Sequence, residues 1–462
     1  MIHQTPWLAR AGDWLRDHRR TILTLQWLIV GIYAVLIIVP LFYPLPDNDA
    51  RILNNITVFA QFCFWGIWWP FVLLSMVLFG RLWCGVLCPE GALSEWAANR
   101  GLGRAIPRWM RWGGWPFTAF ALTTIYGQMV SVYQYPYAVM LVLGGSTVAA
   151  MLVGFVYARN KRAWCKYLCP VNGVFALLSK LSPMYFRTDK QVWDDNLAHE
   201  KANLIKVQPV NCAPLQPLRS MQGGSGCHMC GRCSSYHNAI TLTARSPGDE
   251  VIHLAATESG FWQTALILYG LLGIALGAFH WTASPWFIQY KQFLAGYFID
   301  HEVWWILQTN APWFLLTNYP ANNDVFSWLD GLCLITYILA TALVLGTAIL
   351  LCLMVAVRVA GAFSWQRVHH LAQAFIPLAG AGVFLGLSAT TLSLIRHEGI
   401  ATWWANDLRL GLLVLATLAV VYLALRIIRQ WTRGWRQLPA MVLVLAGLAC
   451  ANAAWGFMFW WW

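Results

Sequence analysis

Long apolar runs separated by short polar segments dominate the chain. Nine of these runs are expected to form helices, and they cover residues 21–43, 57–79, 114–132, 138–158, 259–279, 331–357, 371–394, 408–426 and 438–459. Each run is long enough to cross a hydrocarbon core of ~30 Å at a helical rise of ~1.5 Å per residue. The pattern therefore predicts an all-α polytopic membrane protein with about nine transmembrane helices.

The composition agrees with a membrane protein and excludes an ordinary soluble domain. Of the 462 residues, 59% are hydrophobic and 11% are charged, whereas soluble domains carry about 25% charged residues. A net charge of +12 could suggest nucleic-acid binding, but the basic residues gather in short loops between the apolar runs. We therefore expect the lipid bilayer as a partner and no nucleic acid.

The distribution of Lys and Arg predicts the orientation. These residues are frequent in 1–20, 80–113, 159–162, 358–370 and 426–437 and scarce in the intervening loops. Because basic loops stay in the cytoplasm, the N-terminus is expected inside and the C-terminus outside. The first run is too long for a signal-peptide core, so we interpret it as an uncleaved first span.

A repeated motif carries the chemistry. Residues 81–89 and 162–170 share six of nine positions at an offset of 81 residues, and each copy contains Cys-x3-Cys-Pro. Sulfurs spaced in this way lie about one helical turn apart and can face one metal centre. Two copies on one membrane face supply the four thiolates of an iron–sulfur cluster, from Cys84, Cys88, Cys165 and Cys169. A zinc ion on the same ligands and a packing role for the thiols are the alternatives.

A second cysteine motif lies in a polar insert. Cys227, Cys230 and Cys233 form the Cys-x2-Cys-x2-Cys run of ferredoxins, whose loop holds three corners of a [4Fe–4S] cluster. We expect Cys212 as the fourth ligand, with His237 as its substitute. A three-cysteine zinc site is the alternative.

Three domains follow from these patterns. Residues 1–179 are expected to contain a duplicated two-helix unit with both Cys-x3-Cys-Pro motifs, and 180–257 a small cytoplasmic ferredoxin-like insert. Residues 258–462 would form a five-helix transmembrane domain. Its segment 280–330 is rich in aromatic residues and is expected to lie in the outer interface or to cover the outer face.

Histidines near the membrane faces are candidates for a further cofactor. His280, His301 and His397 are expected near the outer face, and His280 with His397 would provide the two axial ligands of a haem b. Solvated interfacial histidines are the simpler interpretation. Because no dinucleotide fingerprint, P-loop or flavin-attachment signal is visible, a bound nucleotide is not expected.

The cysteine motifs resemble those of membrane-bound ferredoxins of the NapH and NosR type and of proteins linked to cytochrome oxidase maturation. The resemblance covers about residues 20–245 and rests on Cys84/Cys88/Pro89, Cys165/Cys169/Pro170 and the run from Cys227 to Cys233. It implies a multi-pass protein of the bacterial inner membrane that transfers electrons between a cytoplasmic or quinone donor and a membrane or periplasmic partner. Here the insert holds one cluster motif, with His237 at a position where the family has cysteine. The covalent-flavin domain of the NosR type is absent, and the last 200 or so residues remain unmatched.

We therefore expect an iron–sulfur electron-transfer protein with two [4Fe–4S] clusters and either a soluble donor or quinol. Both clusters are expected on the cytoplasmic side of a core ~30 Å thick. Electron delivery to the far face thus predicts another carrier, a haem, flavin or quinone, in the C-terminal spans. The alternatives are a copper reductase or assembly factor for a respiratory oxidase and a redox-sensing membrane protein.

Overall fold

The computed structural model describes residues 6–47, 49–204 and 207–462, and it is largely helical. Within these described residues, eight helical stretches are long and apolar enough to cross a membrane. They are Arg19–Phe42, Ile56–Phe79, Pro136–Val156, Phe261–His280, Trp328–Ala360, Trp365–His397, Ala405–Trp431 and Gln437–Trp461. The predicted all-α polytopic membrane protein is confirmed.

The remaining expected span, 114–132, forms a shorter helix. Helix α6 (Trp115–Met129) has 15 residues, a length of about 22 Å, and turns follow it up to Tyr135. This helix is shorter than the hydrocarbon core of ~30 Å, so a crossing here would include the turns as well.

The chain divides into two compact units that do not follow simple sequence order. Unit 1 comprises Met1–Leu36, Phe71–Pro116 and Gly145–Glu258, and unit 2 comprises Ile37–Pro70, Phe117–Gly144 and Ser259–Trp462. The expected boundary at residue 257 lies next to the last division between the units. The expected segment 1–179 contributes to both units.

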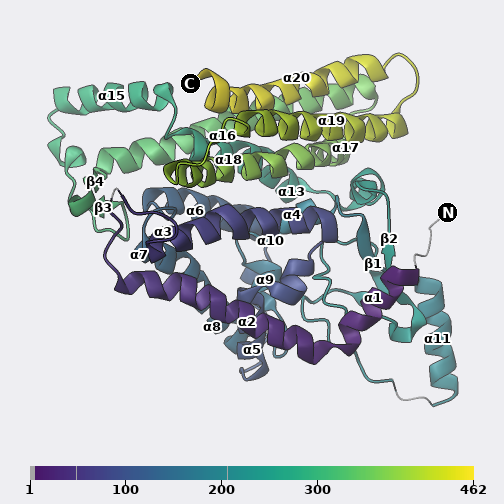
Figure 1. Ribbon diagram of the computed structural model, residues 1–462. Helices are drawn as coiled ribbons and strands as arrows, with labels where there is room; N and C mark the ends of the chain where they lie inside the picture. The colour runs from purple at the N-terminus through teal and green to yellow at the C-terminus, as the bar shows by residue number, and fades with distance from the viewer. Residues whose placement is uncertain (1–5, 48, 205–206) are drawn as a thin grey trace. The chain divides into compact units, whose positions relative to one another are not determined.

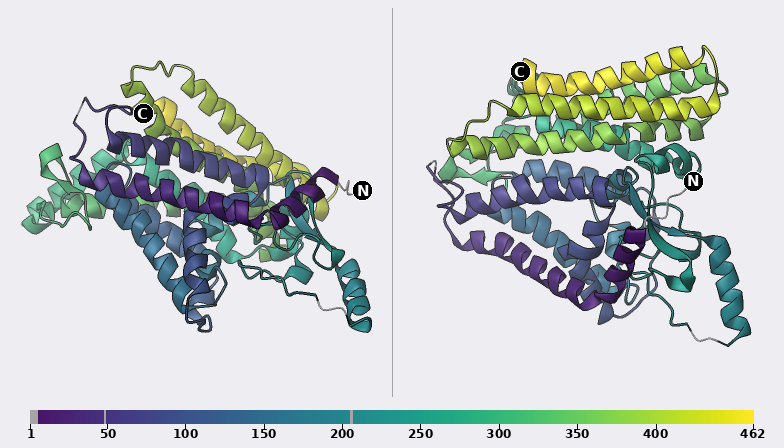
Figure 2. Two further views of the ribbon diagram at one scale, coloured as in Figure 1. Left: turned by 60° about the horizontal axis from the view of Figure 1, so that its bottom comes forward. Right: turned by 45° about the vertical axis from the view of Figure 1, so that its right-hand side comes forward.

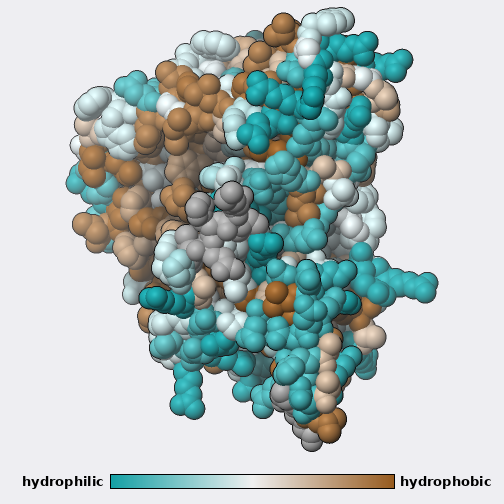
Figure 3. Space-filling model, turned by 90° about the vertical axis from the view of Figure 1, so that its right-hand side faces the viewer, coloured by the Kyte–Doolittle hydropathy of each residue, from teal (hydrophilic) through white to brown (hydrophobic). Residues whose placement is uncertain are grey.

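Unit 1 contains both cysteine motifs. Its helices are α1 (Pro6–Asp17), most of α2 (Arg19–Ile38) and of α4 (Trp69–Phe79), α5 (Pro89–Asn99), α8 (Gly145–Val156), α9 (Ala163–Tyr167), α10 (Asn172–Ser179), α11 (Lys190–Ala202) and α12 (Ala255–Glu258). Strands β1 (Met184–Thr188) and β2 (Ile240–Ala244) pair antiparallel, with Met184 opposite Ala244 and Thr188 opposite Ile240. The side of the molecule on which α11 lies is mostly hydrophilic in the lower half of Figure 3.

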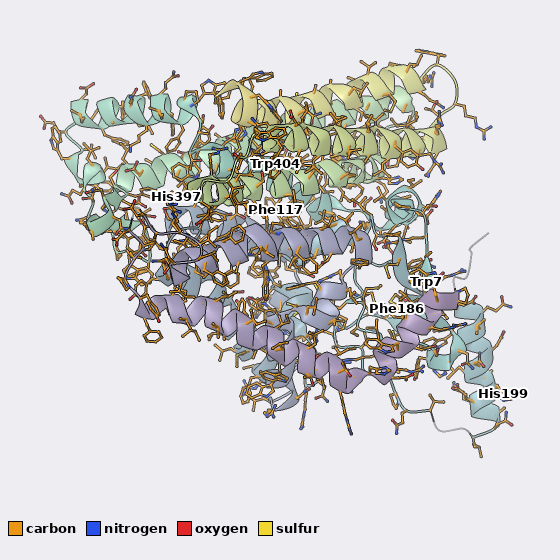
Figure 4. The ribbon with its side chains drawn as sticks, viewed as in Figure 1. Trp7, Phe117, Phe186, His199, His397 and Trp404 are labelled. Carbon is orange, nitrogen blue, oxygen red and sulfur yellow. The ribbon has the colours of Figure 1, made fainter. Side chains whose placement is uncertain are left out.

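A small core joins the strands to the N-terminal helix. Phe186 of β1, Ile240 of β2 and Met229 of the cysteine loop are almost fully buried and pack with Leu8 of α1. Figure 4 shows Phe186 beside α1. The contact is close because α1 carries Gly12, where an added Cβ would lie 3.0–3.2 Å from Ser234, Leu242 and Phe186. The N-terminal helix therefore belongs to the cysteine-rich part of the fold.

Small residues let α5 and α8 approach closely. A Cβ at Gly154 of α8 would lie 2.4 Å from the carbonyl oxygen of Ser94 in α5, and Ala98 and Ala150 are completely buried. Small residues at helix contacts are typical of packing in membrane proteins. Because α5 follows the first Cys-x3-Cys-Pro copy and α8 precedes the second, this contact helps to bring the two copies together.

Unit 2 is built around long helices. It contains α3 (Ile56–Gln61), α6, α7 (Pro136–Val139), α13 (Phe261–Ala265), α14 (Ala275–His280), α15 (Pro285–Asp300), α16 (Trp328–Ala360), α17 (Trp365–Ala372), α18 (Ile376–His397), α19 (Ala405–Trp431) and α20 (Gln437–Gly456). Helices α16, α18, α19 and α20 lie side by side in both Figure 1 and Figure 2. Ser327 and Asp330 form a capping box that fixes the start of α16.

Several helices contain wider, π-helical stretches, at Phe62–Trp68, Trp83–Leu87, Met140–Gly144, Glu250–Leu254, Leu266–Ile274 and Phe457–Trp461. The aromatic segment 280–330 contains α15 and a two-stranded hairpin of β3 (Asn318–Tyr319) and β4 (Asp324–Val325). Trp286 and Phe293 of α15 are exposed. Exposed aromatic rings of this kind suit a helix in a membrane interface.

Candidate metal centre

The two copies of the repeat form one group of four thiols. Cys84 lies in the π-helical turn Trp83–Leu87, Cys88 follows it, Cys165 lies in α9 and Cys169 follows that helix. The four thiols are electrostatic neighbours: Cys88 interacts with Cys84 and Cys165, and Cys169 interacts with Cys165 and Cys88. The structure therefore brings together all four expected residues. We call them the repeat group.

The local backbone explains the match between the copies. The amide of Cys88 donates to the carbonyl of Trp83 (2.8 Å), and that of Cys169 donates to the carbonyl of Trp164 (3.0 Å). The two bonds occupy equivalent positions of the repeat. Pro89 then starts α5, where a missing amide donor costs nothing. Pro170 instead lies two residues before α10.

The remaining four motif cysteines form a second group. Cys212, Cys227, Cys230 and Cys233 all line one small cavity. Met229 and Gly231, between the cysteines, have positive φ angles of 55° and 73°, which turn the Cys-x2-Cys-x2-Cys loop around the cavity. We call these four residues the insert group.

His237 lies outside the insert group. Its Nδ1 atom is 2.7 Å from Glu200, and its ring contacts Trp193 and Tyr236. Cys212, in contrast, lines the cavity together with the other three cysteines. Between the two candidates for the fourth position, the structure brings Cys212 to the group.

Burial keeps the free thiols neutral. It raises the pKa of Cys165 and of Cys227 to about 12 and holds that of Cys169 well above the ordinary value. Ligation requires the thiolate, so these sulfurs ligate only where positive charge compensates for their burial. Amide groups already point at three sulfurs of the two groups at 3.4 Å, from Gly91 to Cys88, from Met229 to Cys227 and from Gln216 to Cys212.

Buried cations supply part of that charge. Arg81 and Arg162 are 4% and 1% exposed, and Nη2 of Arg81 lies 3.9 Å from Sγ of Cys84. Nε of Arg81, Nη2 of Arg162 and Nδ1 of His228 are buried and find no hydrogen-bond partner among the described residues. Such orphaned polar groups are costly and are suited to an anionic group held by the cysteines. The residues present therefore fit an iron–sulfur cluster.

A carboxylate lies between two of the arginines. Glu95 of α5 is 2.8 Å from Arg162 and 2.6 Å from Arg232. Burial raises the pKa of Glu95, but the charge of Arg162 and the hydrogen bonds and charge of Arg232 outweigh burial and lower the pKa to about 2. Glu95 is thus ionised at neutral pH and ties the second repeat copy to the insert.

The spacing of the cysteines also bears on the alternative of a single zinc ion. In the part of the chain that the structure describes, no three His, Cys, Asp or Glu side chains converge closely enough to hold one ion. Tetrahedral zinc with Zn–S bonds of ~2.3 Å needs sulfurs about 3.8 Å apart. A cluster instead takes one cysteine on each iron and accepts wider spacing.

The candidate haem histidines lie in different surroundings. His280 is buried beside the rings of Trp455 and Trp462. His301 is exposed and bonds to the carbonyl of Tyr297, and His397 is exposed at the end of α18. The predicted pairing of His280 with His397 stays a prediction.

Sequence reasoning missed the ionic contacts of the repeat arginines and the role of the N-terminal helix. Glu95 gave no motif signal, although the repeated first residues, Arg81 and Arg162, were visible. Helix α1 covers the insert group: an added Cβ at Gly231 would lie 2.3 Å from Leu15, and Asp13 accepts hydrogen bonds from the hydroxyls of Ser234 and Ser235. The amphipathic pattern of residues 6–17 was the available signal.

Comparison with known proteins bears on both repeat copies. A family model matches residues 62–109 and 140–187, each of which contains one Cys-x3-Cys-Pro motif. That family is the 4Fe-4S binding domain. The two matched segments are thus similar to a domain that binds 4Fe-4S clusters, and together they cover less than half of the chain.

The chain is also similar to the "Putative electron transport protein YccM" of Escherichia coli (strain K12). The two are 25% identical over 247 residues, which cover 46% of this chain and 64% of that protein. The match thus spans slightly less than two thirds of the relative's length. No solved structure matches the chain.

Proposed function

We propose that the chain is a membrane-bound electron-transfer protein that holds two [4Fe–4S] clusters. The repeat group would hold one cluster and the insert group the other. The observation that carries the proposal is the gathering of eight motif cysteines into two separate groups of four. The name of the Escherichia coli relative supports the electron-transfer role. When bound, each cluster accepts or gives up one electron.

The protein's own residues prepare both groups for this chemistry. Amide groups donate to the sulfurs of Cys88, Cys212 and Cys227, and hydrogen bonds to cluster sulfurs adjust the reduction potential. Arg81 and Arg162 lower the energy of negative charge placed near the cysteines. Helix α1 shields the loop of the insert group from water.

We further propose that both groups lie at the cytoplasmic face. Cys88 and Cys165 are neighbours, so the chain between them crosses the membrane an even number of times. Pro136–Val156 provides one crossing, and α6 with its following turns provides the second. This count supports nine crossings, with the N-terminus in the cytoplasm of a bacterial cell and the C-terminus outside.

The donor and acceptor follow from the same placement. A soluble carrier or a quinol would reduce the clusters, and a membrane or periplasmic redox partner would receive the electrons. Transfer to the outer face needs a further carrier in unit 2, and the haem, flavin or quinone expected there stays a prediction.

The direct test is cluster analysis of the anaerobically purified protein. We expect about eight iron atoms and matching sulfide per chain, and an EPR signal after reduction with dithionite. The double variant Cys84→Ser/Cys165→Ser should lose one cluster and retain the other. Stoichiometric zinc without an EPR signal contradicts the proposal.

The fourth ligand of the insert group has its own test. Cys212→Ala should lower the iron content by up to four atoms or convert the insert cluster to a [3Fe–4S] form with a distinct EPR signal. His237→Gln is the matched control, because it removes the other candidate and leaves the cavity lining intact. Loss of iron in His237→Gln alone would reverse the assignment.

A further inference from the structure

The repeat group and the insert group meet at Gly85. This glycine lies between Cys84 and Cys88, and an added Cβ would lie 2.0 Å from the carbonyl oxygen of His228 and 2.9 Å from the amide nitrogen of Cys230. Only glycine permits such a close approach of two backbones. One ligand segment is therefore packed directly against the other.

Arg162 contacts both groups. Its Nη1 donates to the carbonyl of Cys84 at 2.5 Å, and its own amide donates to the carbonyl of Ala213, next to Cys212, at 2.8 Å. Its charge acts on Cys165 and Cys88 of the repeat group and on Cys230 of the insert group. This one buried guanidinium is therefore near ligands of both groups.

Arg81 occupies the equivalent position of the other repeat copy and also contacts both groups. Its guanidinium lies 3.9 Å from Sγ of Cys84 and donates to the carbonyl of Ser225, two residues before Cys227, at 3.0 Å. Its charge acts on Cys165 and on Cys227. The two arginines of the repeat thus both lie where the groups meet.

We infer that the two groups form one electrostatically coupled unit, with Arg81 and Arg162 as positioning residues shared by both. The inference rests on the proposed function, because it concerns clusters held by these cysteines. Charge interactions are weakly screened away from water. A buried guanidinium that stabilises negative charge at one group therefore also stabilises it at the other. Negative charge added to one group raises the cost of adding it to its neighbour.

Redox titration followed by EPR tests the shared cations. In Arg162→Gln both midpoint potentials should shift to lower values relative to the unchanged protein, and Arg81→Gln should shift both in the same direction. Arg219→Gln is the matched control. This arginine also pairs with a carboxylate, Asp194, but the pair is exposed, so neither potential should move. A shift confined to one cluster in both arginine variants would overturn the inference.

The EPR spectrum of the fully reduced, unsubstituted protein provides a second test that needs no arginine variant. Two reduced clusters in adjacent groups should broaden or split each other's signals through magnetic interaction. Cys84→Ser/Cys165→Ser should then give the narrow spectrum of one isolated cluster. If the unsubstituted spectrum is a plain sum of two isolated signals, the groups are independent and the inference is wrong. Absence of iron would instead contradict the proposed function itself.

Discussion

The two copies of the repeat have the same local backbone but different neighbours. Both fold so that the second cysteine donates to the tryptophan five residues earlier. The first copy has Gly85 where the second has Lys166. Gly85 lies against the insert backbone, whereas Lys166 is partly buried and burial lowers its pKa. The duplicated motif therefore sets the local backbone around the thiols in both copies, and contact with the insert gives the two copies different surroundings.

The arginines of the two copies show a second difference. Nη2 of Arg81 donates to the neutral amide of Asn172 at 2.7 Å, while Arg162 pairs with the ionised Glu95 at 2.8 Å. Each arginine thus reaches across to the other half of the pair, since Asn172 follows the second copy and Glu95 follows the first. The positive charge of Arg162 is therefore partly compensated by Glu95, whereas the partner of Arg81 across the pair is neutral.

The largest predicted effect would show that both copies serve one site. Cys84→Ala and Cys165→Ala, made separately, should each remove or damage the same cluster and lower the iron content by up to about four atoms per chain. Cys63→Ala is the control, because Cys63 lies within an apolar span. The measurement is iron per chain with EPR of the reduced protein. If the two variants lose different EPR signals, the copies do not share a cluster.

The second-largest predicted effect comes from removing the charge of Glu95, the partner of Arg162 in the second copy. Glu95→Gln leaves the buried Arg162 and the partly buried Arg232 without their anion, and breaking a buried ion pair costs about 3–5 kcal/mol. We expect a lower thermal midpoint in lipid nanodiscs and reduced iron content. The control is Asp194→Asn, which breaks the exposed pair with Arg219 and should leave the thermal midpoint almost unchanged, because exposed ion pairs contribute little to stability. Equal losses in the two variants would contradict the structural importance of Glu95.

The sequence predicted those features that repeat or follow a fixed period. The apolar runs predicted the helical membrane fold, and the spacing of cysteines predicted which thiols gather. Helix α6 ends at Met129, before the end of its apolar run, and the chain enters a turn in which Ser131 adopts a positive φ of 51°. No local residue type predicted that turn. The strands β1 and β2 were not predicted, because their pairing joins segments more than fifty residues apart.

The ionic contacts of the site could not be read from the sequence for a related reason. Glu95 lies about two helical turns beyond Cys88, with no motif around it, and its partners Arg162 and Arg232 are distant in sequence. The choice between Cys212 and His237 likewise depended on how the chain folds back. Nothing in the sequence indicated a reason for a glycine at position 85, because the requirement comes from the backbone of His228, which packs against it in the fold.

A smaller effect should distinguish Gly85 from Lys166. Gly85→Ala places a methyl group against the carbonyl of His228, and overpacking of this kind costs about 1–3 kcal/mol. We expect a lower thermal midpoint and weaker magnetic interaction between the clusters in EPR. Gly31→Ala is the control, since an added Cβ there meets no atom within 4 Å. Lys166→Ala should leave the magnetic interaction between the clusters unchanged. If Lys166→Ala also weakens that interaction, both repeat copies contact the insert, and the predicted difference between Gly85 and Lys166 is wrong.

The smallest predicted effect concerns the neutral partner of the first copy. Asn172→Ala removes the hydrogen bond from Arg81 and the one that Asn172 donates to the carbonyl of Lys166, but it leaves the bond from Arg81 to Ser225. We therefore expect a loss of about 1–2 kcal/mol. Because no charge is removed, both midpoint potentials should stay close to those of the unsubstituted protein. Glu95→Gln, in contrast, removes a negative charge and should raise the potentials. Asn172→Ala could instead shift the midpoint potentials as far as Glu95→Gln does. In that case the position of the Arg81 guanidinium affects the potentials more than the net charge around it. The two copies would then differ in how their arginines are placed and not in the charge of the arginines' partners.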